Sequence, residues 1–317
     1  MYFLGLDTSC YTTSAALIDF EENLIYDCRT ILKVDDGSRG IRQSDAFYQH
    51  IGNIEGIIER IFKEIDKAKI KAIGISSRPR SVEGSYMPVF NAGLNIGYII
   101  SHVLGVSTFT LSHQEGHVLS GLWSSGLDIT DDLLVYHLSG GTTELIYVEG
   151  RKNMYIRKVG GSSDLKVGQF IDRIGVAMGY KFPCGRELDR LSNKTEVDKI
   201  DIPVSIKDTY ASFSGPETFV QRIISKKEYK SEVIARSVFY CIAKSIEQTL
   251  LNVNINNGCK YVLFVGGVAA NSIIREYLIN SEKIMAKKLI PIFADENYST
   301  DNGVGPAIWA KLHIESQ

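Results

Sequence analysis

The feature that most constrains the fold of this chain is a strand–polar tip–strand unit that occurs twice. The first copy places a strand, a polar tip and a second strand at residues 1–7, 7–14 and 15–19. The second copy, about 130 residues later, has the same three parts at residues 132–138, 139–143 and 144–148. Solenoid repeats recur every ~20–50 residues, so this wider spacing indicates an internal duplication that builds two similar lobes.

The rest of the chain alternates helical periodicity with short apolar strands. Helices are predicted at about 44–68, 88–105, 164–178, 232–253 and from Asn271 onward. Strands are predicted at 71–76, 108–111 and 261–265. Alternation of this kind in both halves predicts an α/β fold with layered sheets.

The composition excludes several classes of protein. The 317 residues are 44% hydrophobic and 23% charged, as expected for a globular protein with one or two domains. A formal charge of −2 gives no global attraction to nucleic acid or membranes. Five cysteines without a Cys-x-x-Cys pair argue against a disulfide framework or a zinc ribbon. Without a signal peptide or an apolar run of ~20 residues, we expect a cytoplasmic protein with no membrane segment.

The second polar tip could surround a phosphate. Unobstructed backbone amides and Ser or Thr hydroxyls donate hydrogen bonds without adding charge. A single tip of this kind is more often an ordinary hairpin turn. Its duplication, together with a strand followed by Gly266-Gly267 and a helix, favours nucleotide binding by an actin-like ATPase.

His113 and His117 lie four residues apart in a predicted helix, so their imidazoles point the same way and could share one metal ion. The alternative is a pair of surface histidines. Asp301, before a glycine-containing helix start, is a candidate third ligand, unless it only caps that helix. In zincin proteases the catalytic Glu directly follows the first His, whereas Glu115 lies two residues on, which disfavours protease activity.

Gly168 and Asp172 lie together on a further predicted helix. A glycine permits close approach by a flat ligand, and a carboxylate can accept hydrogen bonds from ribose hydroxyls. The alternative for Asp172 is an ordinary solvated carboxylate. Residues 182–186 follow as a turn that could line the same pocket.

Taken in order, these segments resemble the TsaD family, formerly called O-sialoglycoprotein endopeptidases, over essentially the whole chain. The family's His-Met-Glu-Gly-His and Ser-Gly-Gly-His-Thr motifs are similar to residues 113–117 and 139–143. Its Gly-Glu-Ala-Phe-Asp-Lys, Tyr-Pro-Gly-Gly-Pro and Phe-Ser-Phe-Ser-Gly motifs resemble residues 168–173, 182–186 and 211–215. Residues 266–271 and 300–302 complete an ordered set that is specific.

The resemblance implies a two-lobed actin-like ATPase fold, a duplicated ribonuclease H-like (ASKHA) architecture. One lobe would comprise residues 1–130 and 302–317 with the metal-binding helix, and the other residues 131–301 with the adenylate-binding motifs. The resemblance further implies one iron or zinc ion on the catalytic residues His113, His117 and Asp301. An adenine nucleotide, either ATP or threonylcarbamoyl-AMP, would contact Ser139, Gly140, Gly141, Thr142, Thr143, Gly168, Asp172, Gly185, Gly267 and Asn271.

The implied reaction is transfer of the threonylcarbamoyl group from threonylcarbamoyl-adenylate to N6 of a tRNA adenosine next to the anticodon. Such an acyl or carbamoyl-type transferase is expected to work with TsaB-like and TsaE-like partners, or as a homodimer. A metal would polarise the carbamoyl oxygen, and lobe closure would exclude water from the mixed anhydride.

Four segments depart from the family pattern. An acidic pair is replaced by Tyr11 and Thr12, and a Tyr-Gly-Gly-Val-Val-Pro-Glu stretch by residues 36–42. A Gly-Pro-Gly-Leu turn is replaced by residues 78–81, and a Lys-Thr pair by residues 217–218. These changes leave two alternatives open: a divergent carbamoyl-type transferase or ATPase with another acceptor, and a non-catalytic nucleotide-binding partner. A sugar kinase has no use for a His/His/Asp site.

Overall fold

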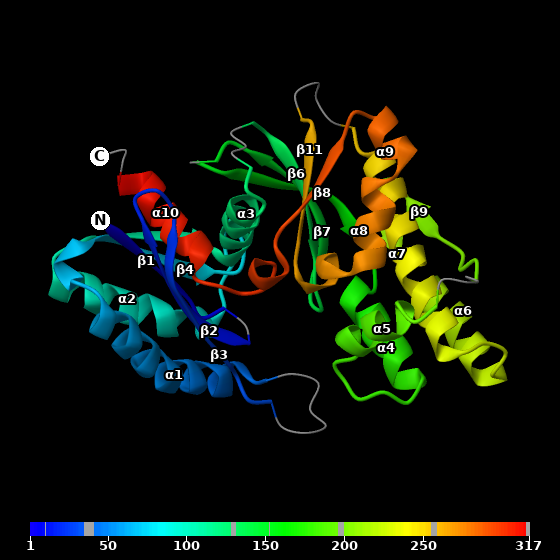
Figure 1. The fold of residues 1–317 in the computed structure, drawn as a ribbon, viewed down its shortest axis with the longest axis horizontal. Helices are drawn as coiled ribbons and strands as arrows, with labels where there is room; N and C mark the ends of the chain where they lie inside the picture. Colours follow the sequence, from blue (N-terminus) through cyan, green and yellow to red (C-terminus); the bar gives the residue numbers. More distant parts are fainter. Residues whose placement is uncertain are drawn as a thin grey trace. The chain divides into compact units, whose positions relative to one another are not determined.

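The computed structural model describes the chain except Cys10 and residues 35–40, 128–130, 152, 196–199, 255–258 and 315–317. It contains two compact units, each described here by itself (Figure 1). The first comprises Met1–Asp128, Arg151–Tyr155 and Thr300–Gln317, and the second Ile129–Gly150 and Ile156–Ser299. The sequence-based boundaries place Asp301 in the second lobe, whereas the structure groups it with the first, because the adjoining Gly303 packs against Gly5.

The first unit is built on a five-stranded sheet. Its strands are β1 (Tyr2–Asp7), β2 (Thr12–Asp19), β3 (Leu24–Ile31), β4 (Ile70–Arg78) and β5 (Ser107–Ser112), in the order β3-β2-β1-β4-β5. The hairpin β1–β2 and the pair β2–β3 are antiparallel, while β4 runs parallel to both β1 and β5. The carboxyl ends of β1, β4 and β5 therefore meet at one edge, where ligands bind in open α/β sheets.

Helices cover both faces of this sheet (Figure 1). They are α1 (Gln43–Glu64), α2 (Asn91–Leu104), α3 (His113–Ser124) and α10 (Val304–Ile314), with short 3-10 turns at Lys67–Lys69 and Pro88–Phe90. Ile54, Ile57 and Ile61 of α1 are at helical spacing and pack on the strand residues Leu4 and Leu17. Full burial of each such side chain stabilises the fold by about 1.5–3 kcal/mol.

The start of α10 lies directly against the opposite face of the sheet. An added Cβ on Gly5 would lie 1.9 Å from the carbonyl oxygen of Gly303, and one on Gly74 1.7 Å from that of Pro306. These two strand positions can therefore only be glycine, since backbone atoms occupy the space of any side chain. This close packing fixes where the chain just before α10 runs.

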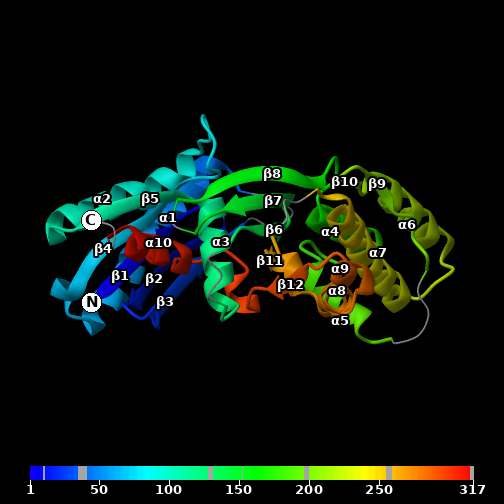
Figure 2. The same cartoon turned by 90° about the horizontal axis from the view of Figure 1, so that it is seen from above.

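The second unit contains a seven-stranded sheet, whose strands β6, β7 and β8 lie side by side in Figure 2. The strands are β6 (Leu133–Leu138), β7 (Thr143–Glu149), β8 (Tyr155–Ser162), β9 (Ser205–Lys207), β10 (Tyr210–Ser212), β11 (Tyr261–Val265) and β12 (Ile290–Phe293). Their order is β12-β11-β6-β7-β8-β10-β9. The hairpin β6–β7 is antiparallel, while β11 runs parallel to β6 and β12.

The helices of the second unit pack on this sheet and on one another. They are α4 (Val167–Ala177), α5 (Gly185–Ser192), α6 (Ser214–Lys226), α7 (Ser231–Asn252), α8 (Ser272–Ile279) and α9 (Glu282–Ala286), with 3-10 turns at Gly267–Ala270 and Glu296–Tyr298. One face of the sheet, with Tyr136 and Phe264, joins Phe170 and Phe239 in a single core. Among the described residues, no helix is both long and apolar enough to cross a membrane.

The two units share one strand plan, which confirms the duplication predicted from the two tips. The order β8-β7-β6-β11-β12 in the second sheet repeats β3-β2-β1-β4-β5 in the first. The central pairs also match in direction, because β6 pairs antiparallel with β7 and parallel with β11, as β1 does with β2 and β4. The predicted two-lobed α/β fold is therefore confirmed.

Candidate functional site

A well-defined helix start presents the two histidines of the HxxxH motif. Strand β5 ends at Ser112, and α3 begins at the next residue, His113. The hydroxyl of Ser112 accepts from the backbone N–H of Glu115 at 3.2 Å, and the Glu115 carboxylate accepts from the backbone N–H of Ser112 at 2.5 Å. This capping box fixes the first turn of α3. His113 and His117 then project from successive turns of one face, as predicted.

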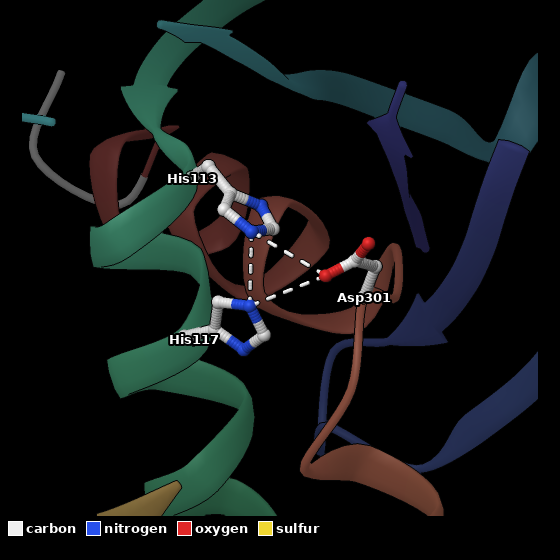
Figure 3. A group of neighbouring side chains, drawn as sticks. All are labelled: His113, His117 and Asp301. Carbon is white, nitrogen blue, oxygen red and sulfur yellow. Dashed lines mark hydrogen bonds and ion pairs between the residues drawn. The ribbon is translucent and has the colours of Figure 1, made fainter. Parts of the chain in front are cut away.

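Three ligand atoms converge in the first unit (Figure 3). The Nε2 atoms of His113 and His117 are 3.0 Å apart, and Oδ1 of Asp301 lies 3.4 Å from each. All three side chains are largely buried, with the Asp301 side chain 18% exposed. Imidazole nitrogens and a carboxylate oxygen are the donor set of zinc and non-haem iron sites.

The spacing of these atoms fits a single divalent ion. Two bonds of ~2.0–2.1 Å at a tetrahedral angle hold ligand atoms roughly 3.3 Å apart. The observed separations of 3.0 and 3.4 Å lie on either side of that value. The sequence-predicted residues His113, His117 and Asp301 are therefore brought together, and they could hold a metal.

Asp301 reaches the cluster from the segment that precedes α10. The neighbouring Asn302, and not Asp301, accepts from the backbone N–H of Val304 at the helix start, at 2.9 Å. The alternative that Asp301 merely caps this helix is therefore wrong. Its carboxylate is directed at His113 and His117 instead.

Asp7 is a fourth member of the site that sequence reasoning placed only in the polar tip. Its Oδ2 lies 2.9 Å from Nδ1 of His113 and accepts from the hydroxyl of Ser76 at 2.8 Å. Its Oδ1 accepts from the backbone N–H of Ser9 at 2.7 Å. The available signal was the position of Asp7 at the end of a predicted strand, because ligands bind at the carboxyl ends of strands in open α/β sheets.

The charges of the cluster shift the pKa values of its members. Burial by itself lowers the pKa of His113, but the carboxylates of Asp7 and Asp301 raise it well above its usual value. Burial and the neighbouring His113 lower the pKa of His117. Burial raises the pKa of Asp301, but hydrogen bonds from the two histidines outweigh it and hold that pKa well below its usual value. The cluster is therefore arranged to attract a positive charge.

One departure from the family pattern lies against α3, the helix that carries His113 and His117. Ser81 donates to the Glu115 carboxylate at 2.9 Å, and Arg78 lies 3.7 Å from it. The backbone N–H of Gln114 donates to the carbonyl of Pro79 at 3.2 Å. Segment 78–81 is thus attached to the first turn of α3. The Glu115 carboxylate is occupied by contacts within the fold, which agrees with the expectation that protease activity is disfavoured.

The predicted phosphate tip lies in the second unit, between β6 and β7. Ser139 closes it, because its backbone N–H donates to the carbonyl of Thr142 at 2.8 Å and its hydroxyl accepts from the Thr142 N–H at 3.0 Å. Gly140 and Gly141 are exposed, and an added Cβ on either would meet nothing within 4 Å. No neighbouring atom therefore crowds either glycine, and the tip remains a predicted phosphate site.

The start of α4 packs against this tip. An added Cβ on Gly168 would lie 2.5 Å from Cα of Gly140 and 2.8 Å from the carbonyl oxygen of Ser139. The hydroxyl of Thr143 accepts from the backbone N–H of Val167 at 2.9 Å. Gly168 is therefore needed for contact between the helix and the tip, and the amino end of α4, which favours anions, lies beside Gly140.

The remaining predicted nucleotide contacts lie in α4, at the starts of α5 and α8, and in the 3-10 turn before α8. Asp172 accepts from the backbone N–H of Cys184, just before α5, at 2.7 Å, and burial raises its pKa. Gly185 opens α5, and an added Cβ there would meet nothing within 4 Å. Asn271 caps α8, since its Oδ1 accepts from the Ile274 N–H at 3.0 Å.

Asp189 is a second residue that sequence reasoning missed. The side-chain amide of Asn271 donates to its carboxylate, which links α5 to the turn before α8. Burial raises the pKa of Asp189, although this hydrogen bond opposes the shift. In the sequence, Asp189 follows Gly185 by four residues, which is about one helical turn. This spacing, which places both residues on one face of a helix, was the available signal for Asp189. Gly267 lies close by in the 3-10 turn that leads to Asn271.

A further departure, Glu217, has a structural role in the second unit. Its carboxylate accepts a hydrogen bond from Arg173 of α4 at 3.2 Å. It also accepts one at 2.8 Å from Gln221, which lies in α6 together with Glu217. The residue is 9% exposed, so the ion pair ties α6 to α4. The acidic residue that replaces the family's lysine is thus accounted for by its partner Arg173.

Solved structures with the same architecture identify the class of fold. The chain resembles (R)-2-hydroxyglutaryl-CoA dehydratase component A of Acidaminococcus fermentans, with a TM-score of 0.58, 16% identity and 99% of each chain covered. It also resembles a ROK family glucokinase from Streptomyces griseus, with a TM-score of 0.53, 12% identity, and 98% and 99% of the two chains covered. The fold is that of the actin-like ATPases, here with a His/His/Asp cluster in the first unit.

Sequence comparison then places the chain within that class. Residues 30–308 match the family model TsaD, described as tRNA N6-adenosine threonylcarbamoyltransferase, and the chain belongs to this family. The enzyme of that name from Persephonella marina is 29% identical, over 96% of this chain and 87% of its own length. A Thermoplasma acidophilum relative named "Probable bifunctional tRNA threonylcarbamoyladenosine biosynthesis protein" is 28% identical, over 100% of this chain and 57% of its own length. The predicted family and the transferase class are confirmed.

Proposed function

We propose that this chain transfers the threonylcarbamoyl group from threonylcarbamoyl-adenylate to N6 of a tRNA adenosine next to the anticodon. In this reaction a bond forms between N6 and the carbamoyl carbon, the bond from that carbon to the phosphate oxygen breaks, AMP leaves, and N6 loses one proton. Membership of the TsaD family supports the proposal. The observation that carries it is the convergence of His113, His117 and Asp301 on one point.

In this proposal the first unit holds one divalent ion, iron or zinc, on those three side chains. When bound, the ion supplies a Lewis acid that polarises the carbamoyl oxygen and stabilises charge developing there. The protein residues orient and bury the ligand atoms, so that little reorganisation is needed during the reaction. Phe90, buried beside the ring of His113, provides an apolar wall that strengthens these interactions.

The second unit, in the same proposal, binds the adenylate. The backbone amides of Gly140 and Gly141, with the amino end of α4, hold the phosphate. The carboxylates of Asp172 and Asp189 accept hydrogen bonds from ribose hydroxyls, while the open backbone at Gly185 admits the flat adenine ring. Gly267, Asn271 and the hydroxyls of the tip complete the nucleotide contacts.

The proposed partners are the tRNA substrate and TsaB-like and TsaE-like proteins, with a homodimer as the alternative, and the proposed location is the cytoplasm. The Thermoplasma relative is named as bifunctional. A second function on one chain supports the proposal that this chain acts together with a partner protein. The alternative function is carbamoyl transfer to another acceptor. The attachment of Arg78 and Ser81 to Glu115 favours it, because a segment that departs from the family lies against the metal-ligating helix.

The test is incorporation of labelled threonine into unmodified tRNA by the purified chain. The reaction contains ATP, bicarbonate, the adenylate-forming enzyme and the helper proteins. We expect incorporation by the wild type, a loss of at least ~100-fold in His113→Ala, and full activity in His102→Ala, which removes an exposed histidine of α2. A folded wild-type protein that binds nucleotide but gives no incorporation would contradict transfer to tRNA.

A further inference from the structure

We propose that Asp7 is a positioning residue that orients His113 for metal binding, an inference that rests on the proposed metal site. Asp7 is 2% exposed and hydrogen-bonded to the His113 nitrogen that faces away from Asp301. Neither the HxxxH spacing nor the family motifs quoted above include it. The contact joins residues 106 positions apart, so only the folded chain creates it.

The contact with Asp7 determines which nitrogen of His113 carries a proton. An ionised carboxylate can only accept, so the 2.9 Å contact with Oδ2 of Asp7 requires a hydrogen on Nδ1. In the neutral ring this leaves the lone pair on Nε2, the atom that faces His117 and Asp301. Asp7 therefore selects the tautomer that can bind a cation at the cluster.

Asp7 is itself held in a fixed position by its neighbours. Its carboxylate receives three hydrogen bonds from three different segments: the hydroxyl of Ser76 on β4, the backbone N–H of Ser9 and the ring of His113. Each oxygen is held, so the group cannot rotate away from His113. A carboxylate fixed in this way restrains the rotation of the imidazole ring as well as its tautomer.

The two carboxylates of the cluster contact different nitrogens. Asp301 contacts the Nε2 side of both histidines at 3.4 Å and keeps a side-chain exposure of 18%. Asp7 contacts only the Nδ1 side of His113, and its oxygens are used by neighbouring donors. Asp301 is thus positioned to bind the metal directly, whereas Asp7 is positioned to orient the metal-binding residue His113.

Charge balance supports the same assignment. When His113 and His117 bind an ion through neutral rings, the carboxylates of Asp7 and Asp301 supply a charge of −2, which one divalent ion cancels. Loss of the Asp7 charge would leave the ion with an uncompensated positive charge in a buried site, which is costly. Asp7 should therefore raise metal affinity without touching the metal.

The experiment measures Zn²⁺ affinity of the full chain by competition with a chelating dye. We expect affinity to fall ~10–100-fold in Asp7→Ala, the range seen for partners behind metal ligands. Asp7→Asn keeps the size and one acceptor oxygen, so it should lose less. Ser76→Ala removes one donor to the carboxylate and should lose a few-fold. The matched control is Ser14→Ala, whose hydroxyl donates to the backbone carbonyl of Asp7 and not to its carboxylate; it should bind as the wild type does.

A second readout follows the ring of His113 directly. In the Zn²⁺-loaded wild type, the Nδ1–H proton of His113 should give a downfield, slowly exchanging NMR signal that is absent in His113→Ala. The signal should disappear or exchange rapidly in Asp7→Ala, and it should move upfield in Asp7→Asn, whose amide oxygen is a weaker acceptor. General loosening of the fold, checked by thermal melting, would not remove this one proton selectively.

The outcomes separate this inference from the proposed function. Wild-type binding of Zn²⁺ that is lost in His113→Ala but unchanged within twofold in folded Asp7→Asn and Asp7→Ala would overturn the role of Asp7 alone. A wild-type protein that binds no Zn²⁺, or binds it equally well in His113→Ala, would overturn both the metal site and the inference.

Discussion

The two units use the same arrangement of five strands but end their first strand differently. In the first unit β1 ends at Asp7, a buried carboxylate that binds neighbouring side chains. In the second, β6 is followed by Ser139 and two exposed glycines whose backbone is open. Topology therefore decides where functional groups gather, and a few residues at the strand ends decide which ligand they suit.

The same contrast holds at the next strand of each sheet. β4 carries Ser76, whose hydroxyl donates to Asp7, so this strand supports a charged cluster. β11 leads into Gly266, which has a φ of 94° and lies against the carbonyl of Leu138, so this strand shapes a close-packed backbone turn. The candidate metal site of the first unit is therefore built from side chains, whereas the candidate nucleotide site of the second unit is built largely from main chain.

The largest expected effect separates the two sites by removing a ligand of the first. His117→Ala should lower Zn²⁺ affinity by more than ~100-fold, because a two-ligand site holds a metal poorly. Affinity for an adenine nucleotide should stay within twofold, since every predicted nucleotide contact lies in the second unit. Dye competition and nucleotide calorimetry on the same sample measure both, and a parallel loss of nucleotide affinity would contradict independent sites.

The reciprocal change is Gly168→Ala in the second unit. Its Cβ would overlap the backbone of Gly140 and push α4 away from the tip, so nucleotide affinity should fall by about tenfold or more and stability by about 1–3 kcal/mol. Zn²⁺ affinity should not change. The matched control is Gly56→Ala in α1, where an added Cβ meets nothing within 4 Å and helix propensity predicts a gain of about 0.5–1 kcal/mol. Unchanged nucleotide affinity in Gly168→Ala would show that the tip does not depend on α4.

The smallest expected effect concerns pH and the second unit alone. Burial raises the pKa of Asp164, but hydrogen bonds from Ser212 and the backbone N–H groups of Phe213 and Leu165 outweigh it and hold this pKa below its usual value. A group whose pKa is lower in the folded than in the unfolded state stabilises the protein above pH ~4. This stabilisation is lost as the pH falls towards the pKa of the folded state.

Asp164→Asn should therefore lower the melting temperature by a few degrees at pH 7, with a smaller difference at pH 3.5. Thermal melts at the two pH values measure this. Zn²⁺ affinity at pH 7 serves as the control and should not change. An equal difference at both pH values would mean that the ionised form of Asp164 contributes no stability.

Much of the fold was predictable because the informative patterns are local. The spacing of Ile54, Ile57 and Ile61 predicts α1, and the two polar tips predict the duplication. His113 and His117 were predictable as a pair for the same reason, since helix geometry alone places residues four apart on one face. The relative positions of residues within one helix or strand could therefore be predicted without knowledge of the fold.

Other parts of the site were not predictable from local patterns. Asp301 and Asn302 are adjacent candidates for the cap and the ligand, and only the packing of α10 on Gly5 and Gly74 decides between them. Gly168 was expected to admit a ligand, whereas in the structure it admits the backbone of the tip.

The sequence by itself therefore determined the α/β class, the two-lobed duplication, the family and the HxxxH pair, because each depends on short-range periodicity or on motifs read in order. The tertiary structure decided that Asp301 joins the histidines, that Asp7 lies behind His113, and that Asp189 bonds to Asn271. These contacts depend on which strands are neighbours and how helices pack on them, and such long-range geometry is set by the whole core rather than by any one segment.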